Sequence, residues 1–392
     1  MFAWPTVDVD ALRAHRRARV AATMDELGVD HLLLTGPDQI RYATDFRAQI
    51  ISEAHDWFAV VVDRDGLADV FGPSGGETVL DPYPDLPQVR AEHPLPSWSP
   101  AVGHPGVWVA AVAAELRRRG AHAVGYEGLD PALLLGLEEA LPHVGFRPAA
   151  TALFLARQVK HPIEIELIGA TARVNAGAMA AALDAAAVGA TDHDLLAVAN
   201  AHAQRMGAEF LTHAVCNVRK GTGDWFAHGA RLRANEAFFF DIGCYGRGGY
   251  ASDAARTGFV GEPPAVVVAA YERLLEAYEA VIAAARPGVR ASQLVATVND
   301  HLAGHGLGTT PYAIGHGVGL RGCELPTLHR PDLVDRDAAL EEGFVIALEP
   351  ETTVLVDGRP VVLKVEDNFA VEASGLRRLT EPPALEQLIR AA

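Results

Sequence analysis

The chain has 392 residues, of which 49% are hydrophobic, so it is long enough for two domains and can bury a sizeable core. Its net charge of −17 argues against a surface for nucleic acid or anionic membranes, and no apolar run approaches the length of a membrane span. The N-terminal stretch carries acids early and has no apolar core segment, so we expect a cytoplasmic protein without a signal peptide. Three scattered cysteines, Cys216, Cys244 and Cys323, argue against a disulfide framework and a thiolate zinc site.

Helical and strand patterns alternate in the first part of the chain, which predicts an α/β domain. A Pro-rich segment, Pro82 to Pro105, is expected to be an irregular connection within it. The expected helices cover residues 11–27, 110–119 and 131–141, and the expected strands cover 31–36, 58–66 and 122–128.

The character of the sequence changes after Gln158. His161 and Pro162 open a long Ala-rich helix, with Pro162 near its first turn and acids just inside it, as a helix N-terminus prefers. We therefore place a domain boundary here, which gives domains 1–158 and 159–392.

The second part contains a weak internal repeat, because residues 185–207 resemble residues 283–306. In each copy one Gly ends an Ala-rich helix (Gly189, Gly288) and another follows eighteen residues later (Gly207, Gly306), as expected of glycines at helix C-termini. Two Ala-rich helix pairs with ordinary caps would give the same spacing. The β-type sequence after each copy favours a duplicated αβ unit, which would place a site between its halves.

Two acids bracket a glycine-rich turn. The continuous apolar run of residues 238–240 is typical of a buried strand and ends at Asp241; the chain turns through Gly246–Gly249 and returns to Asp253. A hairpin would bring these carboxylates together, where they repel each other unless a cation lies between them. Solvated turn acids are the alternative, which the apolar flanks disfavour.

One imidazole and two further carboxylates lie downstream. His316 stands between glycines, which let the backbone approach another group closely, although a structural His would look the same. Glu349 and Glu366 each end or lie within an apolar strand pattern. Four carboxylates converging with one imidazole would describe a site for two divalent ions such as Mn, Fe, Co or Zn, which typically generates a hydroxide nucleophile and stabilises an oxyanion.

In this order, the segments LGVDHLLLTGPDQIRYATDF, VKHPIEIELI, DIG…GYASDAART, GHGVGL, ALEP and KVED resemble the pita-bread metallopeptidase family of methionine aminopeptidase, aminopeptidase P, prolidase and creatinase. The resemblance covers most of the chain. It implies a creatinase-type N-terminal α/β domain, a catalytic domain of two duplicated αβ units related by a pseudo-twofold axis, a homodimer and a dinuclear centre. The implied metal ligands are Asp241, Asp253, His316, Glu349 and Glu366.

The chain departs from the family pattern at the histidines that handle the substrate carbonyl and protons in the peptidases. Seven residues after His316 stands Cys323, followed by Glu324, and seventeen residues before Asp241 stands Asp224. The hairpin between the two aspartates is also one residue longer than usual, which the extra Gly of GRGG would absorb in the turn.

Three other histidines are candidates to replace the missing imidazoles. His228 precedes a Gly, and a loop shortened by four residues would restore it to the upstream role; the alternative is a surface His. His329 would supply an imidazole from a shifted position, although a surface His fits better. His213, near a strand end, is a weaker candidate to face the pocket. We expect Cys323 to fill the space of the lost His rather than to act as an unusual thiol.

The resemblance also implies supporting residues. Arg256, three residues after Asp253, matches an Asp-x-x-Arg pattern and is expected to support the ligands rather than touch substrate. Tyr250 is grouped with it as a residue near the ligands or the substrate. In related dimers the N-terminal region can reach the partner's active site, and the candidates here are Tyr42, Arg47, His55 and Trp57.

The resulting hypothesis is metal-assisted hydrolysis of a dipeptide or small amide, with an Xaa-Pro peptidase as the default and Glu349 as general base. The altered histidines keep two other functions open. One is a lyase that acts like the family's dimethylsulfoniopropionate lyase, or a biosynthetic tailoring enzyme; the other is a non-catalytic binding protein, which the retained ligands disfavour.

Overall fold

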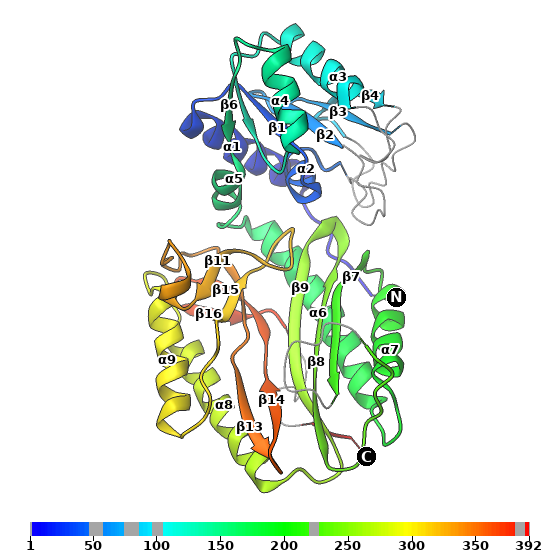
Figure 1. Ribbon diagram of the computed structural model, residues 1–392, viewed down its shortest axis with the longest axis vertical. Helices are drawn as coiled ribbons and strands as arrows, with labels where there is room; N and C mark the ends of the chain where they lie inside the picture. The colour runs from blue at the N-terminus through cyan, green and yellow to red at the C-terminus, as the bar shows by residue number, and fades with distance from the viewer. Residues whose placement is uncertain are drawn as a thin grey trace. The chain divides into compact units, whose positions relative to one another are not determined.

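A computed structural model of the chain describes residues 2–46, 58–73, 86–95, 105–218, 227–380 and 389–391. They form two compact units, each with its own sheets and helices (Figure 1). The N-terminal unit comprises Asp8–Arg157, and the C-terminal unit comprises Met1–Val7 and Gln158–Ala392. The first residues of the chain therefore belong with the C-terminal unit, where the Trp4 indole donates to Met206 O at 2.9 Å.

A six-stranded mixed sheet of order β4-β3-β2-β1-β5-β6 forms the centre of the N-terminal unit. Strand β1 pairs antiparallel with β2 and parallel with β5. The predicted α/β alternation is confirmed. The strands are β1 (His31–Leu34), β2 (Ala59–Asp63), β3 (Ala68–Pro73), β4 (Val89–Leu95), β5 (Ala123–Tyr126) and β6 (Gly145–Pro148); the helices are α1 (Val9–Leu27), α2 (Pro37–Thr44), α3 (Pro105–Arg118), α4 (Pro131–Ala140) and α5 (Ala150–Ala156).

The Pro-rich segment is not wholly irregular, which corrects the expectation from the sequence. Residues 89–95 form β4, which pairs in parallel with β3 at the edge of the sheet. An edge strand tolerates Pro94 because one side of its backbone needs no partner strand. Residues 82–85 and 96–104 lie outside the described ranges.

The C-terminal unit contains a four-stranded sheet of order β17-β9-β8-β7, a five-stranded sheet of order β11-β10-β12-β15-β16 and the hairpin β13-β14. Its helices are α6 (Pro162–Asp184), α7 (Asp192–Arg205), α8 (Ala265–Ala284), α9 (Ala291–Gly304) and the 3-10 turns η1 (Arg247–Gly249) and η2 (Pro331–Leu333). Its strands are β7 (Phe210–Val218), β8 (Glu236–Tyr245), β9 (Ala251–Val260), β10 (Ala313–Gly317), β11 (Glu324–His329), β12 (Val345–Leu348), β13 (Glu351–Val356), β14 (Arg359–Lys364), β15 (Asp367–Glu372), β16 (Gly375–Arg378) and β17 (Ile389–Ala391).

Each of the two larger sheets carries its own helix pair. Buried residues of α6 and α7, such as Met179 and Leu195, pack with Phe240 of β8, whereas buried residues of α8 and α9, such as Leu274 and Val298, form a second core with the five-stranded sheet. Figure 1 shows the two pairs beside their respective strands. Helix α6 begins as predicted: the Glu164 carboxylate accepts from the His161 N–H, and Pro162 is the first helical residue.

The glycines of the internal repeat occupy matching positions. Gly207 and Gly306 directly follow the C-caps of α7 and α9 and have φ of 84° and 70°, the left-handed conformation that glycine adopts at little cost. Gly189 and Gly288 instead lie beyond the C-caps of α6 and α8, in the turns that lead into the next helix, again with positive φ. Each copy is thus a helix pair followed by antiparallel strands.

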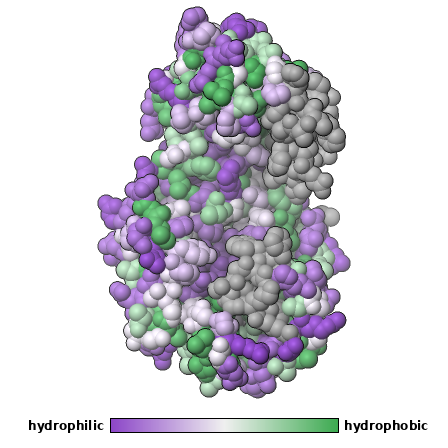
Figure 2. All heavy atoms as spheres, viewed as in Figure 1, coloured by the Kyte–Doolittle hydropathy of each residue, from purple (hydrophilic) through white to green (hydrophobic). Residues whose placement is uncertain are grey.

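The outer surface is mixed in character. Hydrophilic and hydrophobic residues are interspersed on the face shown in Figure 2, and exposed large hydrophobics such as Leu135, Val188 and Leu355 come from separate elements. Within the described ranges, no helix is both long and apolar enough to cross a membrane.

Candidate metal centre

Residues predicted as ligands come together where the strands of the C-terminal unit meet. Asp241 lies on β8, Asp253 on β9 and His316 on β10, while Glu349 directly follows β12 and Glu366 lies between β14 and β15. Glu349 is the most accessible of them, with 16% of its side chain exposed, and the other four are buried.

The two aspartates are diagonal neighbours on the β8–β9 hairpin. Asp241 lies opposite Ala255, and Asp253 lies opposite Gly243. Residues at such positions share one face of the sheet. The turn absorbs the additional residue through η1, where Gly248 and Gly249 both have φ of 79°.

His213 reaches the aspartates across Gly243. On β7 it pairs with Gly243, whose other neighbour is Asp253, so the three residues lie in line across three strands. Its Nε2 atom lies 3.1 Å from Asp241 Oδ1 and 3.1 Å from Asp253 Oδ1. A Cβ atom on Gly243 would lie 2.8 Å from His213 Cε1, so the glycine leaves the space that the imidazole ring occupies. Thr212 Oγ1, 2.8 Å from Nδ1, can accept the Nδ1 proton and leave Nε2 to face the carboxylates.

His316 presents Nε2 to the other side of Asp253. Its Nδ1–H donates to Gly317 O at 3.0 Å, which leaves the Nε2 lone pair directed at the carboxylates. Nε2 lies 3.7 Å from Asp253 Oδ2, 3.7 Å from Glu349 Oε1 and 4.0 Å from Glu366 Oε1. The two oxygens of Asp253 thus face two different imidazoles.

Lys364 also lies at the centre and is absent from the predicted site residues. Its Nζ donates to Asp241 Oδ2 at 2.6 Å and lies 2.7 Å from Glu349 Oε2 and 3.6 Å from Glu366 Oε2. The sequence did contain a signal: Lys364 and Glu366 are two residues apart, and alternate residues of an extended segment face the same side.

Negative charge dominates the electrostatics of the centre. Burial opposes ionisation of Asp241, but Lys364 and His213 outweigh it and lower the Asp241 pKa. Burial likewise opposes protonation of His213, yet Asp253 and Asp241 raise the His213 pKa to about 11. Burial and the charge of Asp253 raise the pKa of Glu366 well above its ordinary value, although Lys364 acts in the opposite direction.

His213 and Lys364 lie near these carboxylates, but three buried carboxylate oxygens still lack a hydrogen bond within the described ranges. Asp253 Oδ1 and both carboxylate oxygens of Glu366 are buried and have no hydrogen-bond partner among the described residues. Buried carboxylates are costly unless they are paired or bind a cation. Two sets of convergent ligand atoms share Asp253, namely His213–Asp241–Asp253 and Asp253–His316–Glu366. Carboxylate and imidazole ligands of this kind fit divalent Mn, Fe, Co or Zn.

Arg256 lies behind the ligands in a buried network. Its Nη1 donates to Ala255 O and to Glu366 O at 2.7 and 2.6 Å, and its Nη2 donates to Asp367 Oδ1 at 2.6 Å. Asn368 Oδ1 accepts from the Asp253 N–H at 3.0 Å. These contacts hold the backbone on which Asp253 and Glu366 are carried.

Tyr250 and Glu324 make ion-pair or hydrogen-bond contacts with residues at the start of the C-terminal unit. The Tyr250 hydroxyl donates to Glu164 Oε1 at 2.8 Å, which ties the hairpin to α6. Glu324 accepts from Lys160 Nζ at 2.7 Å in a fully buried pair. Both contacts connect structural elements of the unit.

Cys323 stands at the position of the absent peptidase His and is exposed. Partial burial of its thiol and the charges of Glu349 and Asp253 raise the Cys323 pKa to about 11. A raised pKa disfavours the thiolate, which is the nucleophilic form of cysteine.

The structure does not place His228 with the ligands. The side chain of His228 is exposed, and its backbone N–H donates to Asp192 Oδ2 at 2.8 Å. The Gly229 N–H donates to the other oxygen of the same carboxylate, so this segment is held against the first turn of α7. His329 lies half-buried on β11, where burial lowers its pKa.

The remaining candidates do not lie among the ligand residues that the structure describes. Asp224, Arg47, His55 and Trp57 lie outside the described residues. Tyr42 is buried in the N-terminal unit, where the guanidinium groups of Arg16 and Arg157 lie over its ring.

Comparison with known proteins places the chain in a family. The model of metallopeptidase family M24 matches residues 166–373, more than half of the chain. The Xaa-Pro dipeptidase of Pyrococcus horikoshii is 26% identical over 272 residues, which cover 65% of this chain and 75% of that protein.

Solved structures share the fold. The prolidase from Pyrococcus horikoshii superposes with a TM-score of 0.78 at 20% identity and covers 94% of this chain and 99% of its own. The X-Pro aminopeptidase from Thermotoga maritima gives a TM-score of 0.80 at 17% identity, covering 95% and 99%. The predicted pita-bread fold is confirmed, and the chain belongs to metallopeptidase family M24 as a metal-dependent hydrolase.

Proposed function

We propose that the chain is a dinuclear metal-dependent hydrolase that cleaves Xaa-Pro dipeptides or closely related small amides. The observation that carries the proposal is the set of buried carboxylate oxygens of Asp253 and Glu366 without a hydrogen-bond partner among the described residues, beside the imidazoles of His213 and His316. Relatives named Xaa-Pro dipeptidase support the substrate class.

Two ligand sets would hold the two ions. Asp253, His316 and Glu366 would form one set, and His213, Asp241 and Asp253 the other, with one oxygen of Asp253 directed to each. Glu349, the remaining carboxylate, lies at the accessible side of the centre. When bound, the ions would supply Lewis acidity and lower the pKa of a water molecule.

Glu349 is suited to accept the proton of that water. Its Oε2 is held by Lys364 at 2.7 Å, its Oε1 faces His316 at 3.7 Å, and 16% of the side chain is exposed. A positioned carboxylate that reaches the solvent-facing side of a site can serve as general base. Lys364 would also keep Asp241 ionised, because a buried ammonium favours the charged form of a neighbouring carboxylate.

His213 compensates for the imidazoles that the peptidase pattern lacks. Neither Cys323 nor His228 supplies a group of that kind to the ligands, whereas His213 Nε2 lies within 3.1 Å of two of them. Among the described residues, His213 from β7 and His316 from β10 thus both direct an imidazole toward the carboxylates.

Metal analysis paired with a peptide panel tests the proposal. Purified protein is loaded with Mn or Co, its bound metal is measured, and Gly-Pro, Ala-Pro and Leu-Pro are compared with Gly-Leu. Two ions per chain with proline-dependent cleavage would support a dipeptidase. Bound metal without any cleavage would instead favour the lyase or tailoring reaction, and product analysis by mass spectrometry would separate an amine plus acid from an alkene. A chain that binds no metal would contradict the proposal.

Three finer points are part of the same proposal. The resemblance implies a homodimer, which light scattering of the purified chain tests. The identity of the native metal, with Mn as one candidate, is tested by metal analysis without added ions. The cytoplasmic location expected from composition is tested by cell fractionation.

A further inference from the structure

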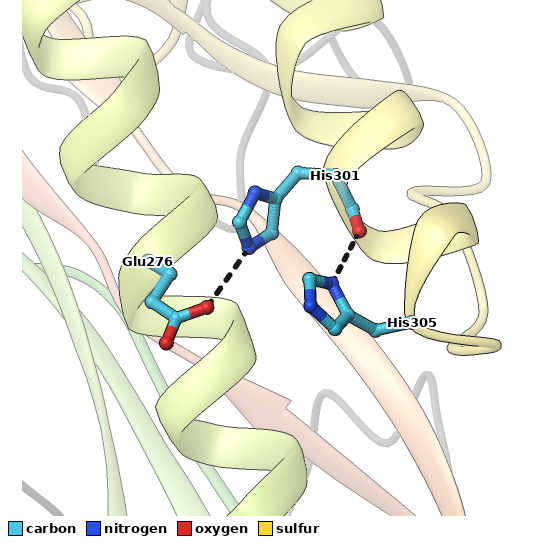
Figure 3. Close-up of side chains that lie close together, drawn as sticks. All are labelled: Glu276, His301 and His305. Carbon is cyan, nitrogen blue, oxygen red and sulfur yellow. Dashed lines mark hydrogen bonds and ion pairs between the residues drawn. The ribbon is translucent and has the colours of Figure 1, made fainter.

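A second group of metal-ligating side chains lies on the surface of the C-terminal unit (Figure 3). Glu276 projects from α8, and His301 and His305 lie one helical turn apart at the end of α9. Glu276 and His305 are exposed and His301 is partly exposed. None of the three contributes to the buried centre described above.

The two helices hold these side chains in fixed relation. Leu274 and Tyr278 of α8 pack with Val298 and Leu302 of α9 in one buried core, on either side of the surface group. Only side-chain rotations are therefore needed to adjust the three ligand atoms, which all lie within 4.8 Å of one another.

The hydrogen bond of His305 fixes its tautomer. Nδ1 lies 2.9 Å from His301 O, and since a carbonyl oxygen can only accept, Nδ1 carries the proton. The lone pair of the neutral ring is then on Nε2, which points toward the group in Figure 3. A ring N–H bound to a backbone carbonyl is a common second-shell arrangement of metal-ligating histidines.

The distance between His301 Nε2 and Glu276 Oε2 is close to that expected for two ligands of one metal ion. His301 Nε2 lies 3.3 Å from Glu276 Oε2. Two ligands bound to one tetrahedral zinc ion at about 2.0–2.1 Å are about 3.4 Å apart. The His301 imidazole therefore needs little movement to share an ion with the carboxylate, and the ligand atom of His305 lies within 4.8 Å of both.

Electrostatics at this position favour a cation. His301 lies in the last turn of α9 and His305 is its C-cap, where the helix dipole and the free carbonyls are negative. Arg273 pairs with the other oxygen of Glu276, so Oε2 is left to face His301.

In a third group of similar composition, arginine side chains neutralise the carboxylates. Asp69, His93 and Glu115 of the N-terminal unit also converge, but arginines satisfy both carboxylates: Arg90 and Arg119 pair with Asp69, and Arg118 and Arg119 pair with Glu115. At Glu276, by contrast, Arg273 pairs with one carboxylate oxygen, and the imidazoles of His301 and His305 lie beside the carboxylate.

We propose that Glu276, His301 and His305 form a surface site for a divalent transition metal ion that links α8 to α9. Two imidazoles and a carboxylate select Zn²⁺, Cu²⁺, Ni²⁺ or Co²⁺ over Mg²⁺ and Ca²⁺. With three protein ligands, a fourth position is open to water.

Equilibrium dialysis against zinc chloride tests the site in the full-length chain. The proteins are wild type, His301→Gln/His305→Gln, Asp253→Asn and the variant that combines all three changes. His122→Gln/His143→Gln, which removes two exposed histidines outside any of the three groups, is the matched control. Circular dichroism establishes that each variant is folded.

The expected result is that Asp253→Asn loses zinc from the buried centre but retains one saturable equivalent, and that the combined variant loses this equivalent. Each single change, His301→Gln or His305→Gln, should weaken that equivalent by at least roughly tenfold, the loss that even outer-shell changes cause. Zinc should also raise the Tm of Asp253→Asn and not that of the combined variant.

Equal zinc binding by Asp253→Asn and the combined variant would overturn the surface site, as would an equal loss in the His122→Gln/His143→Gln control. The two proposals fail separately. If Asp253→Asn binds as much zinc as wild type, the buried centre is refuted, while the effect of the histidine pair still reports on the surface site.

Discussion

Ala255 and Glu366 exchange backbone hydrogen bonds of 3.4 and 2.9 Å, and this isolated pair joins β9 to the segment that enters β15. Asp253 lies two residues from one side of the join, and Glu366 is itself the other side. The guanidinium of Arg256 donates to the carbonyl oxygens of both paired residues. The distance between the Asp253 and Glu366 carboxylates therefore depends on the buried guanidinium of Arg256, which holds the backbone behind them.

Replacing Arg256 by Met should destabilise the C-terminal unit. Arg256 and Asp367 are a fully buried ion pair at 2.6 Å, and the change would leave the Asp367 charge without its main partner. Breaking one side of such a pair costs about 3–5 kcal/mol of unfolding free energy. Urea denaturation of the two proteins measures the difference.

The double variant Arg256→Met/Asp367→Asn is the control, because it removes both charges. It should recover part of the lost stability. A single variant that loses less than about 1 kcal/mol, the scale of an exposed ion pair, would mean that the buried network does not support the join.

Asp253→Ala should abolish metal loading of the buried centre and activity together. Asp253 directs Oδ1 toward His213 and Oδ2 toward His316, so its loss removes a ligand from both sets. Metal content by mass spectrometry and hydrolysis of an Xaa-Pro dipeptide are measured in parallel, with the exposed Asp335→Asn as a control for altered surface charge. Activity at the wild-type level in Asp253→Ala would contradict the proposal that Asp253 binds two catalytic ions.

His213→Ala should reduce the metal content of the buried centre from two ions toward one, because it removes the only imidazole of the His213–Asp241–Asp253 set. Thr212→Val removes the hydroxyl next to Nδ1 and should retain both ions with an affinity lowered by roughly 10–100-fold. The visible absorption spectrum of the cobalt-loaded proteins reports the change in ligands without relying on activity. If His213→Ala still bound two cobalt ions at the buried centre with an unchanged absorption spectrum, His213 would not be a metal ligand. It would then be only a hydrogen-bond partner of the aspartates.

After a chelator has removed the metal, the free energy of unfolding of the apoprotein should fall as pH rises from about 6.5 to 9. Glu366 and His213 both have pKa values raised above their ordinary values of 4.5 and 6.5, so the folded apoprotein holds more protons than the unfolded chain in this range. A state that binds more protons loses stability as pH rises. Urea denaturation at several pH values should give a decreasing trend for the apoprotein.

The same measurement on Glu366→Gln and His213→Gln apoproteins identifies the groups responsible. Each variant should show a weaker pH dependence than the wild-type apoprotein, and bound metal should suppress the trend in the wild type. A stability that rises with pH over this range would contradict the assigned directions.

Several helices and strands could be predicted because their signals are local. Period-3.6 patterns predicted α1 and α6, the apolar run of residues 238–240 predicted β8, and the glycine-rich turn predicted the hairpin that carries Asp241 and Asp253. Residues 89–95 were misjudged since prolines flank them, and only the neighbouring β3 reveals that β4 is an edge strand.

The sequence by itself determined which acids and which imidazole lie in apolar or glycine-rich surroundings, because burial pattern and turn chemistry are properties of short segments. It could not decide which histidine meets them. His213 reaches Asp253 only because the pairing register of β7, β8 and β9 places Gly243 between them. Lys364 contacts Asp241 although the two residues are 123 positions apart in the sequence. Contacts of this kind depend on how separate strands align in space, and that alignment is determined by the packing of the whole unit.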